Sequence, residues 1–231
     1  MATEPPPQSF DGVAAVYDDT QPVHVVEHYL QKRVAFALRT FPPGARLLDV
    51  GCGTGRLSER LRAAGFKMTG LDNSLGMLTS AHARGLAVVR GTAAAMPWRD
   101  GTFDGTISVA VMHHLRTPEL VRAAIGEMVR VTRRGGRAVV WDHSPVNPYW
   151  YFYMRRIPQD DGSERLVPKR ELIDDVRAAG GRLRDAVRLG FMPDFMPRRC
   201  TSAAAVAERV LEALPFTRWI AAHNVVVAEK P

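Results

Sequence analysis

A short glycine-rich stretch between two apolar segments holds the side chains best suited to chemistry. Residues 47–55 read Leu-Leu-Asp-Val-Gly-Cys-Gly-Thr-Gly, and Asp72 stands at the end of the next apolar segment. A strand, a glycine turn, a helix and a second strand that ends in an acid are typical of a nucleotide-binding βαβ unit. The glycines let the backbone approach a ligand closely and leave helix N–H groups free to bind it.

The spacing of the glycines argues against a dinucleotide as the ligand. A dinucleotide fingerprint requires a glycine at position 56, where this chain has Arg56. Asp49 lies two residues before the first glycine, and its carboxylate would repel a pyrophosphate. A ligand with a ribose and a positive charge fits better, because Asp49 can lie near an ammonium and Asp72 can accept both ribose hydroxyls.

With these features the stretch resembles motif I of the class I S-adenosylmethionine (SAM)-dependent methyltransferases, and specific motifs extend the resemblance over roughly residues 10–145. It implies SAM as cofactor, S-adenosylhomocysteine (SAH) as product and an in-line displacement of the methyl group. In this family an acid usually accepts from the adenine amino group where this chain has Thr92. The candidate cofactor-binding residues are Asp49, Gly51, Cys52, Gly53, Gly55, Asp72, Asn73, Met77, Thr92, Ala93 and Ala110.

Two adjacent histidines, His114 and His113, follow the fourth apolar segment, at a place where this family often has one or two. They are candidate catalytic residues. Either they line the pocket near the methyl group, or one of them is a general base, which is needed only if the acceptor must lose a proton of high pKa. No carboxylate or cysteine stands beside them in the sequence, so we expect no metal site.

The hydrophobic pattern predicts an α/β fold in which strands and helices alternate. Such an alternation with short connections favours a doubly wound, mostly parallel sheet. The resemblance adds that this Rossmann-like sheet has seven strands, with the last one antiparallel between the fifth and sixth. We expect Gly135-Gly136 to end the helix that starts at Thr117-Pro118, Pro215 to end the helix over 201–214, and Asn147–Trp150 to be loop.

We expect a single domain over residues 1–231. Its SAM-binding core comprises 41–141, 168–190 and 219–231, residues 1–40 form an N-terminal helix and lid, and 142–167 and 191–218 are insertions for the acceptor. Aromatic side chains beside arginines favour a small-molecule or lipid-like acceptor with an anionic group, or a peripheral membrane contact. The N-terminal stretch also resembles small-molecule methyltransferases, including those that methylate quinones. Candidate acceptor contacts are Tyr17, Tyr149, Tyr153, Arg155 and Arg156.

The composition is that of an ordinary soluble protein, with a net charge of +7. Two cysteines outside any metal or redox spacing, no signal-peptide pattern and no long apolar run predict a cytoplasmic protein without a membrane span. The basic residues are scattered and almost all arginine, which does not favour a nucleic-acid partner. A nucleic-acid or protein methyltransferase, or a protein that uses SAM as a bound cation without methyl transfer, remains an alternative to a small-molecule methyltransferase.

Overall fold

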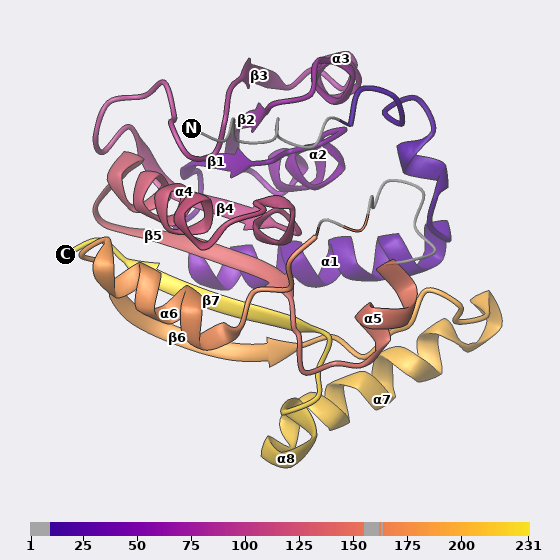
Figure 1. Cartoon of the computed structure of the whole chain (residues 1–231). Helices are drawn as coiled ribbons and strands as arrows, with labels where there is room; N and C mark the ends of the chain where they lie inside the picture. The colour runs from indigo at the N-terminus through magenta and orange to yellow at the C-terminus, as the bar shows by residue number, and fades with distance from the viewer. Residues whose placement is uncertain (1–9, 155–161, 163) are drawn as a thin grey trace.

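A seven-stranded sheet forms the centre of the computed structural model, which describes residues 10–154, 162 and 164–231 (Figure 1). The strand order is β3-β2-β1-β4-β5-β7-β6. The first five strands are parallel, and β7 pairs antiparallel with both β5 and β6. This confirms the predicted sheet and the place of its last strand. The strands are β1 (Arg46–Val50), β2 (Lys67–Asp72), β3 (Ala87–Arg90), β4 (Phe103–Val109), β5 (Thr132–His143), β6 (Arg182–Leu189) and β7 (His223–Glu229).

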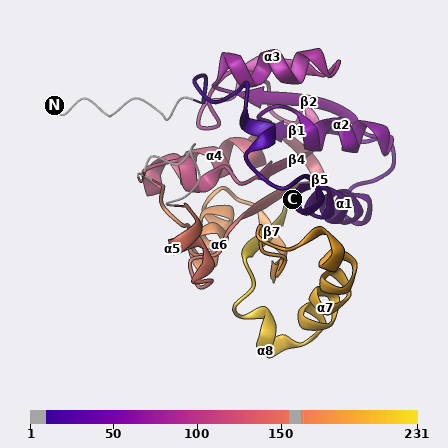
Figure 2. The same cartoon turned by 90° about the vertical axis from the view of Figure 1, so that its right-hand side faces the viewer.

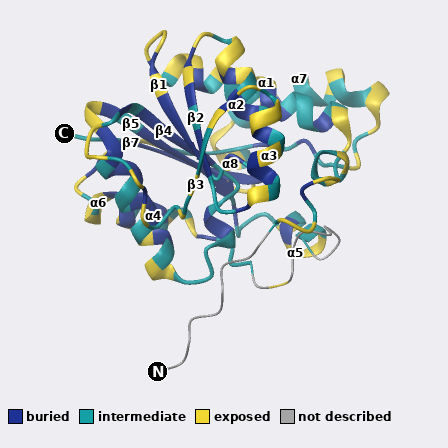
Figure 3. Cartoon of the chain, turned by 90° about the horizontal axis from the view of Figure 1, so that it is seen from above, coloured by how far each residue is buried: buried dark blue, intermediate teal, exposed yellow. Residues whose placement is uncertain are grey.

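Helices cover both faces of the sheet, and the strands are accordingly buried on both sides (Figures 2 and 3). Alternation along β7 shows this, because Val225 and Val227 belong to one apolar cluster while Val226 and Ala228 belong to the other. Side chains of α1 (Val23–Thr40), α2 (Arg56–Ala63) and α3 (Leu75–Ala83) complete the first cluster. Those of α4 (Pro118–Val131) and α6 (Lys169–Ala178) complete the second.

The start of α4 follows the prediction, but its end does not. Thr117 caps the helix by accepting a hydrogen bond from the N–H of Leu120 (3.3 Å), and a proline occupies the first turn. The helix then ends at Val131, before the two glycines, because Thr132 turns extended and its hydroxyl donates to the Met128 carbonyl (2.7 Å). Gly136 instead lies inside β5, where a Cβ would stand 2.5 Å from the Asp104 carbonyl oxygen.

The helix end expected at Pro215 is confirmed, whereas the loop expected over Asn147–Trp150 needs correction. Helix α7 (Thr201–Ala213) ends just before Pro215, but this proline starts a further short helix, α8 (Pro215–Arg218), since proline fits the first turn. The stretch from Asn147 is not all loop. The Asn147 side chain accepts a hydrogen bond from the N–H of Tyr149 (2.9 Å) and thereby starts helix α5 (Tyr149–Tyr153).

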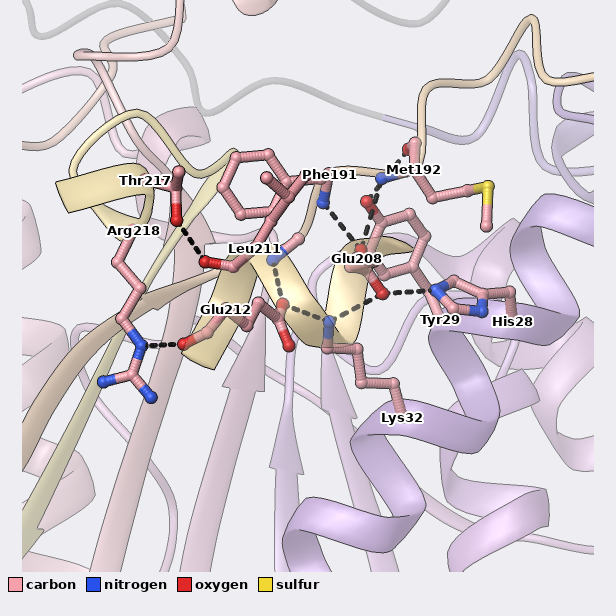
Figure 4. A network of polar contacts seen from close by, with 11 residues as sticks. His28, Tyr29, Lys32, Phe191, Met192, Glu208, Leu211, Glu212, Thr217 and Arg218 are labelled. Carbon is pink, nitrogen blue, oxygen red and sulfur yellow. Dashed lines mark hydrogen bonds and ion pairs between the residues drawn. The ribbon is translucent and has the colours of Figure 1, made fainter. Parts of the chain in front are cut away.

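A buried carboxylate, that of Glu208, attaches α7 to α1 (Figure 4). One of its oxygens accepts from the N–H groups of Phe191 (2.6 Å) and Met192 (3.2 Å). The other lies 2.7 Å from His28 Nε2 and 2.8 Å from Lys32 Nζ. Burial alone would raise the pKa of Glu208, but the hydrogen bond from His28 and the charge of Lys32 outweigh it and hold the pKa at about 2. The contact is therefore an ion pair at neutral pH.

Replacing Glu208 by alanine should loosen α7, because Lys32 and two backbone N–H groups would then lose a buried partner. Breaking one side of a buried pair costs about 3–5 kcal/mol. Amide hydrogen exchange over α7 should accelerate accordingly. In the wild type the same protection should persist above the unfolded-state pKa and decline only as the pH falls from about 4.5 toward 2, since the folded-state pKa is depressed.

The matched control is Glu27→Ala, which removes an exposed ion pair with Arg60. Exposed pairs are worth at most about 1 kcal/mol, so exchange over α7 should hardly change. Equal exchange in both variants would contradict a role of Glu208 in holding α7.

Candidate functional site

The glycine turn after β1 is fixed by bonds to β2. The N–H groups of Gly51 and Cys52 donate to the Leu71 carbonyl (2.7 and 3.0 Å), and the N–H of Gly53 donates to the Asp72 carboxylate (2.8 Å). Gly51 and Gly53 have φ of +72° and +54°, which non-glycine residues rarely adopt. A Cβ on Gly51 would also stand 2.4 Å from the Val111 side chain. The turn thus requires glycine for its conformation and for its packing.

A cavity of about 120 Å³ opens between this turn and the ends of β2, β3 and β4. Acidic Asp72 is half-buried there, and no Lys or Arg is among the described residues that line the cavity. Backbone without side chains, an acid and no cation fit the adenosyl and sulfonium parts of SAM and disfavour a pyrophosphate. Eight of the predicted cofactor-binding residues line the cavity: Gly51, Gly53, Asp72, Asn73, Met77, Thr92, Ala93 and Ala110.

The other predicted cofactor-binding residues lie around the turn. Asp49 and Cys52 line a second, adjoining cavity. Asp49 is only 2% exposed and accepts a hydrogen bond from the Ser58 hydroxyl (2.7 Å). Burial raises its pKa to about 6, against that hydrogen bond and with help from the charge of Asp72. Gly55 precedes α2 with φ +83°, and a Cβ there would clash with the side chain of Leu86 at 2.4 Å, so both its conformation and its packing require glycine.

Thr92, which replaces the acid usual in the resembled family, is exposed at the rim of the first cavity. Its hydroxyl accepts a hydrogen bond from the N–H of Ala94 (3.3 Å) and so stabilises the turn after β3. The adenine contact of Thr92 stays a prediction.

The second cavity, of about 220 Å³, shares part of its wall with the first. Both are lined by Tyr17, Gly51, Gly53, Ala110 and His114. Ala110 has φ +56°, the one non-glycine residue of the described chain with positive φ, and it lies in this shared wall. Backbone held in such a conformation is often found at functional sites. The two cavities together form one site with two compartments.

His113 lines the second compartment and pairs with a carboxylate buried behind it. Asp142, at the end of β5, lies 2.7 Å from Nδ1 of His113 and also accepts from the N–H groups of Val111 (3.0 Å), Met112 (2.6 Å) and His143 (2.7 Å). Burial favours the neutral form of Asp142, but the charge of His113 and these hydrogen bonds prevail and hold its pKa below the usual range. The bond to Nδ1 orients the ring and leaves Nε2 as its other proton-binding atom.

Aromatic rings stack beside this pair. His143 stacks on Trp150 with ring centroids 3.6 Å apart and on His113 at 4.3 Å, while His114 lies 3.9 Å from His113. Burial lowers the pKa of His143 and His114 well below its usual value, and that of His223 to about 3. These three rings are therefore neutral and offer flat, weakly polar surfaces.

A single arginine of α1, Arg33, also lines the second compartment. Its guanidinium carbon lies 5.6 Å from the centroid of the Tyr29 ring and 5.9 Å from that of Trp141. Its Nε is buried and has no hydrogen-bond partner among the described residues. Burial lowers the pKa of Arg33, against the charges of Tyr29, Tyr17 and Asp49, but arginine retains its charge in proteins. A buried donor without a partner indicates a place for a ligand group.

Of the predicted acceptor contacts that the structure describes, Tyr17 lies in the site, whereas Tyr149 and Tyr153 lie outside it. Tyr17 lines both compartments. Tyr149 donates to Asp194 (2.8 Å) and stacks on Tyr153 at 4.9 Å, so it joins α5 to the segment after β6, and neither tyrosine is among the described lining residues. Arg155 and Arg156 lie outside the described residues.

Sequence reasoning missed Arg33, Asp142 and the rings of Tyr29, His143, Trp150 and His223. Two signals were present in the chain. Arg33 interrupts the apolar stripe of α1 between Leu30 and Ala37, and Asp142 follows the fifth apolar strand as Asp72 follows the second.

Comparisons with known proteins agree with this geometry. A family model described as a methyltransferase domain matches residues 48–140. The chain is 37% identical over 158 residues to a demethylmenaquinone methyltransferase of Mycobacterium marinum, covering 65% of this chain and 67% of that protein. A protein of the same name from Renibacterium salmoninarum is 34% identical over 164 residues, covering 64% and 68%. The matches thus span about two thirds of these curated relatives.

The fold is similar to that of a solved SAM-dependent methyltransferase of Thermotoga maritima, a possible histamine N-methyltransferase. The TM-score is 0.72 at 22% sequence identity, with 96% of this chain and 98% of that chain covered. At this identity the likeness concerns the fold.

Replacing Asp72 by asparagine should weaken SAM binding about a hundredfold. Each hydrogen bond to a charged group is worth about 1.5–3 kcal/mol, and the two ribose hydroxyls would lose a charged acceptor. Isothermal titration calorimetry measures the change. Asp104→Asn is the matched control, because Asp104 pairs with Arg133 at the opposite end of its strand. Unchanged affinity in a folded Asp72→Asn protein would contradict the assignment of the first cavity.

Affinity for SAM should also fall as the pH drops below about 6. Asp49 takes up a proton there and can no longer attract the SAM ammonium, which stays charged in this range. The dissociation constant should rise by up to about tenfold per pH unit. The Asp49→Asn variant should bind SAM weakly, and its dissociation constant should not change between about pH 5 and pH 6. A flat profile in the wild type would rule out the contact with Asp49.

Proposed function

The chain belongs to the class I SAM-dependent methyltransferases, and we propose that it methylates a flat aromatic acceptor with an ionisable hydroxyl group, as in a quinol. It is a small-molecule methyltransferase with SAM as cofactor, which supplies a methyl group activated by a sulfonium. We assign SAM to the first cavity, with Asp72 toward the ribose and Asp49 toward the ammonium. The acceptor is assigned to the second compartment.

The observation that carries the acceptor class is that this compartment is lined both by His113, which pairs with the buried Asp142, and by Arg33. His113 acts as general base at Nε2 and takes the proton of the acceptor hydroxyl. Asp142 positions the imidazole and stabilises the imidazolium that forms. Arg33 binds the resulting oxyanion, which supplies the missing partner of its guanidinium. His114 lines the wall between the compartments, where its neutral ring separates them without taking a proton.

The flat rings of the compartment support an aromatic acceptor. Trp150 and His143 are stacked at 3.6 Å, and the neutral His143 carries no charge that would oppose an apolar ring. The name of the curated relatives, demethylmenaquinone methyltransferase, supports a quinone-type acceptor as well. Trp150 and Asp194, which line this compartment, come from residues 142–167 and 191–218. Their position supports the assignment of both segments to acceptor binding.

Two substitutions should separate proton transfer from acceptor binding. His113→Gln should lower kcat for a hydroquinone about 10²–10⁴-fold, because the general base is lost. Arg33→Gln should instead raise the KM for the acceptor by about tenfold or more, because the oxyanion loses a charged donor. SAH formation measures both, and calorimetry should show nearly unchanged SAM affinity.

The matched controls are His82→Gln and Arg39→Gln, which change exposed residues of α3 and α1. Both should keep wild-type kinetics. Acceptors in which the hydroxyl is replaced by methoxy should show no difference between wild type and His113→Gln. If no hydroxylated aromatic gives SAH above background, the acceptor class is wrong, whereas the family and the cofactor site are unaffected.

A further inference from the structure

Helix α7 places two glutamates on its inward side and large apolar side chains on its outward side, unlike an ordinary surface helix. Its buried side carries Glu208, and partly buried Glu212 follows one turn later. Its exposed side carries Val206 and Val210, which are 58% and 57% exposed. A surface helix of a soluble protein places apolar side chains inward and charged ones outward. The outward apolar side of α7 is therefore suited to contact something other than water.

More exposed apolar side chains follow directly after α7, in and around α8. Phe216 is 75% exposed, Trp219 is 62% exposed, and Leu214 and Ile220 are exposed as well. Both helices project from the body of the protein, away from the sheet and from α3 (Figures 1 and 2). We name this surface the outer face, made of Val206, Val210, Leu214, Phe216, Trp219 and Ile220.

The charges around the outer face are basic. Residues 191–220 contain three acids, and each has an internal partner. Glu208 and Glu212 bind Lys32 of α1 (Figure 4), and Asp194 accepts from Tyr149. The four arginines of the same segment, by contrast, are exposed: Arg198, Arg199, Arg209 and Arg218.

We propose that the outer face binds the surface of an anionic lipid bilayer. Exposed Phe and Trp beside arginines are the side chains that enter the headgroup region and attract anionic lipids. A protein partner of ordinary composition would not place negative charge opposite all four arginines, whereas an anionic bilayer presents negative charge across the whole outer face. Within the described part of the chain no helix is long and apolar enough to cross a membrane, so the contact would be peripheral.

The position of the outer face would suit an apolar acceptor. The segment that leads into α7 contributes Asp194 to the acceptor compartment, and Glu208 of α7 binds the N–H groups of Phe191 and Met192 in that segment. A bilayer at the outer face would therefore lie next to the wall of the compartment. The bilayer contact itself does not depend on the acceptor class proposed above.

Flotation of the full chain with vesicles tests the proposal. Vesicles of phosphatidylcholine with about one third phosphatidylglycerol should bind the protein at least tenfold more tightly than pure phosphatidylcholine, and salt should weaken the binding. The double variant Phe216→Ser/Trp219→Ser should lose at least tenfold in partition. Arg198→Gln/Arg199→Gln/Arg209→Gln should lose the preference for the anionic vesicles.

The matched control is Leu75→Ser on α3, a leucine 56% exposed at the opposite end of the molecule, which should bind like the wild type. Trp219 provides a second readout, since Trp141 and Trp150 are buried and the half-buried Trp98 packs against Phe103 of β4, away from the outer face. Its emission should shift to the blue on vesicles, and Trp219→Phe should bind but show no such shift. Equal binding of wild type and double variant, or absence of binding to anionic vesicles, would overturn the proposal. So would a dimer in light scattering that the double variant abolishes, because the face would then pair two copies.

Discussion

The carboxylate of Asp142 is the interaction on which both compartments depend. It is fully buried at the end of β5 and accepts hydrogen bonds from three backbone N–H groups and from His113. Two of those N–H groups, at Val111 and Met112, belong to the turn that follows β4. This carboxylate thereby fixes the turn that carries Ala110, His113 and His114. The same turn forms part of the wall between the compartments. A hydrophobic side chain of the same size could pack there but could not hold the turn, because three buried N–H groups would lose their acceptor.

Acids and a cation lie close together around the glycine turn. Asp49 is buried and Asp72 is half-buried, and the charge of Asp72 helps to raise the pKa of Asp49. Two acids so close together are costly unless a cation relieves them, which favours a ligand with a sulfonium and an ammonium. Arg33 in the second compartment is a half-buried cation, and its buried Nε has no hydrogen-bond partner within the part of the chain that the structure describes. The same argument with the sign reversed favours an anionic oxygen there.

The sequence predicts what depends on neighbouring residues, and misses what depends on distant ones. The glycine turn, the cap at Thr117 and the alternation of strands and helices are set by local pattern, and the structure has them. The place of the last strand was implied by the family resemblance, and the structure has it as well. The predicted end of α4 is wrong because Gly136 does not end a helix. It allows close packing of β5 against Asp104, a residue of another strand. Asp142 stands 29 residues from His113, and nothing in the local pattern of either side chain pairs them. In the sequence, Arg33 is one of many arginines, and only the fold shows that it lines a cavity.

Helix α1 connects the acceptor compartment to α7. Lys32 and Arg33 are neighbours on this helix and point about 100° apart around its axis. Lys32 binds Glu208 of α7, while Arg33 faces the compartment. Because Glu208 also holds the backbone of Phe191 and Met192, the segment that contributes Asp194 is held to α1 by the same ion pair. The two glutamates of α7 are thus engaged in holding the acceptor wall, and its outward side carries Val206 and Val210 beside Arg209. The inward position of the glutamates follows from the attachment of α7 to α1, and it leaves apolar side chains exposed near the compartment to which we assign the acceptor.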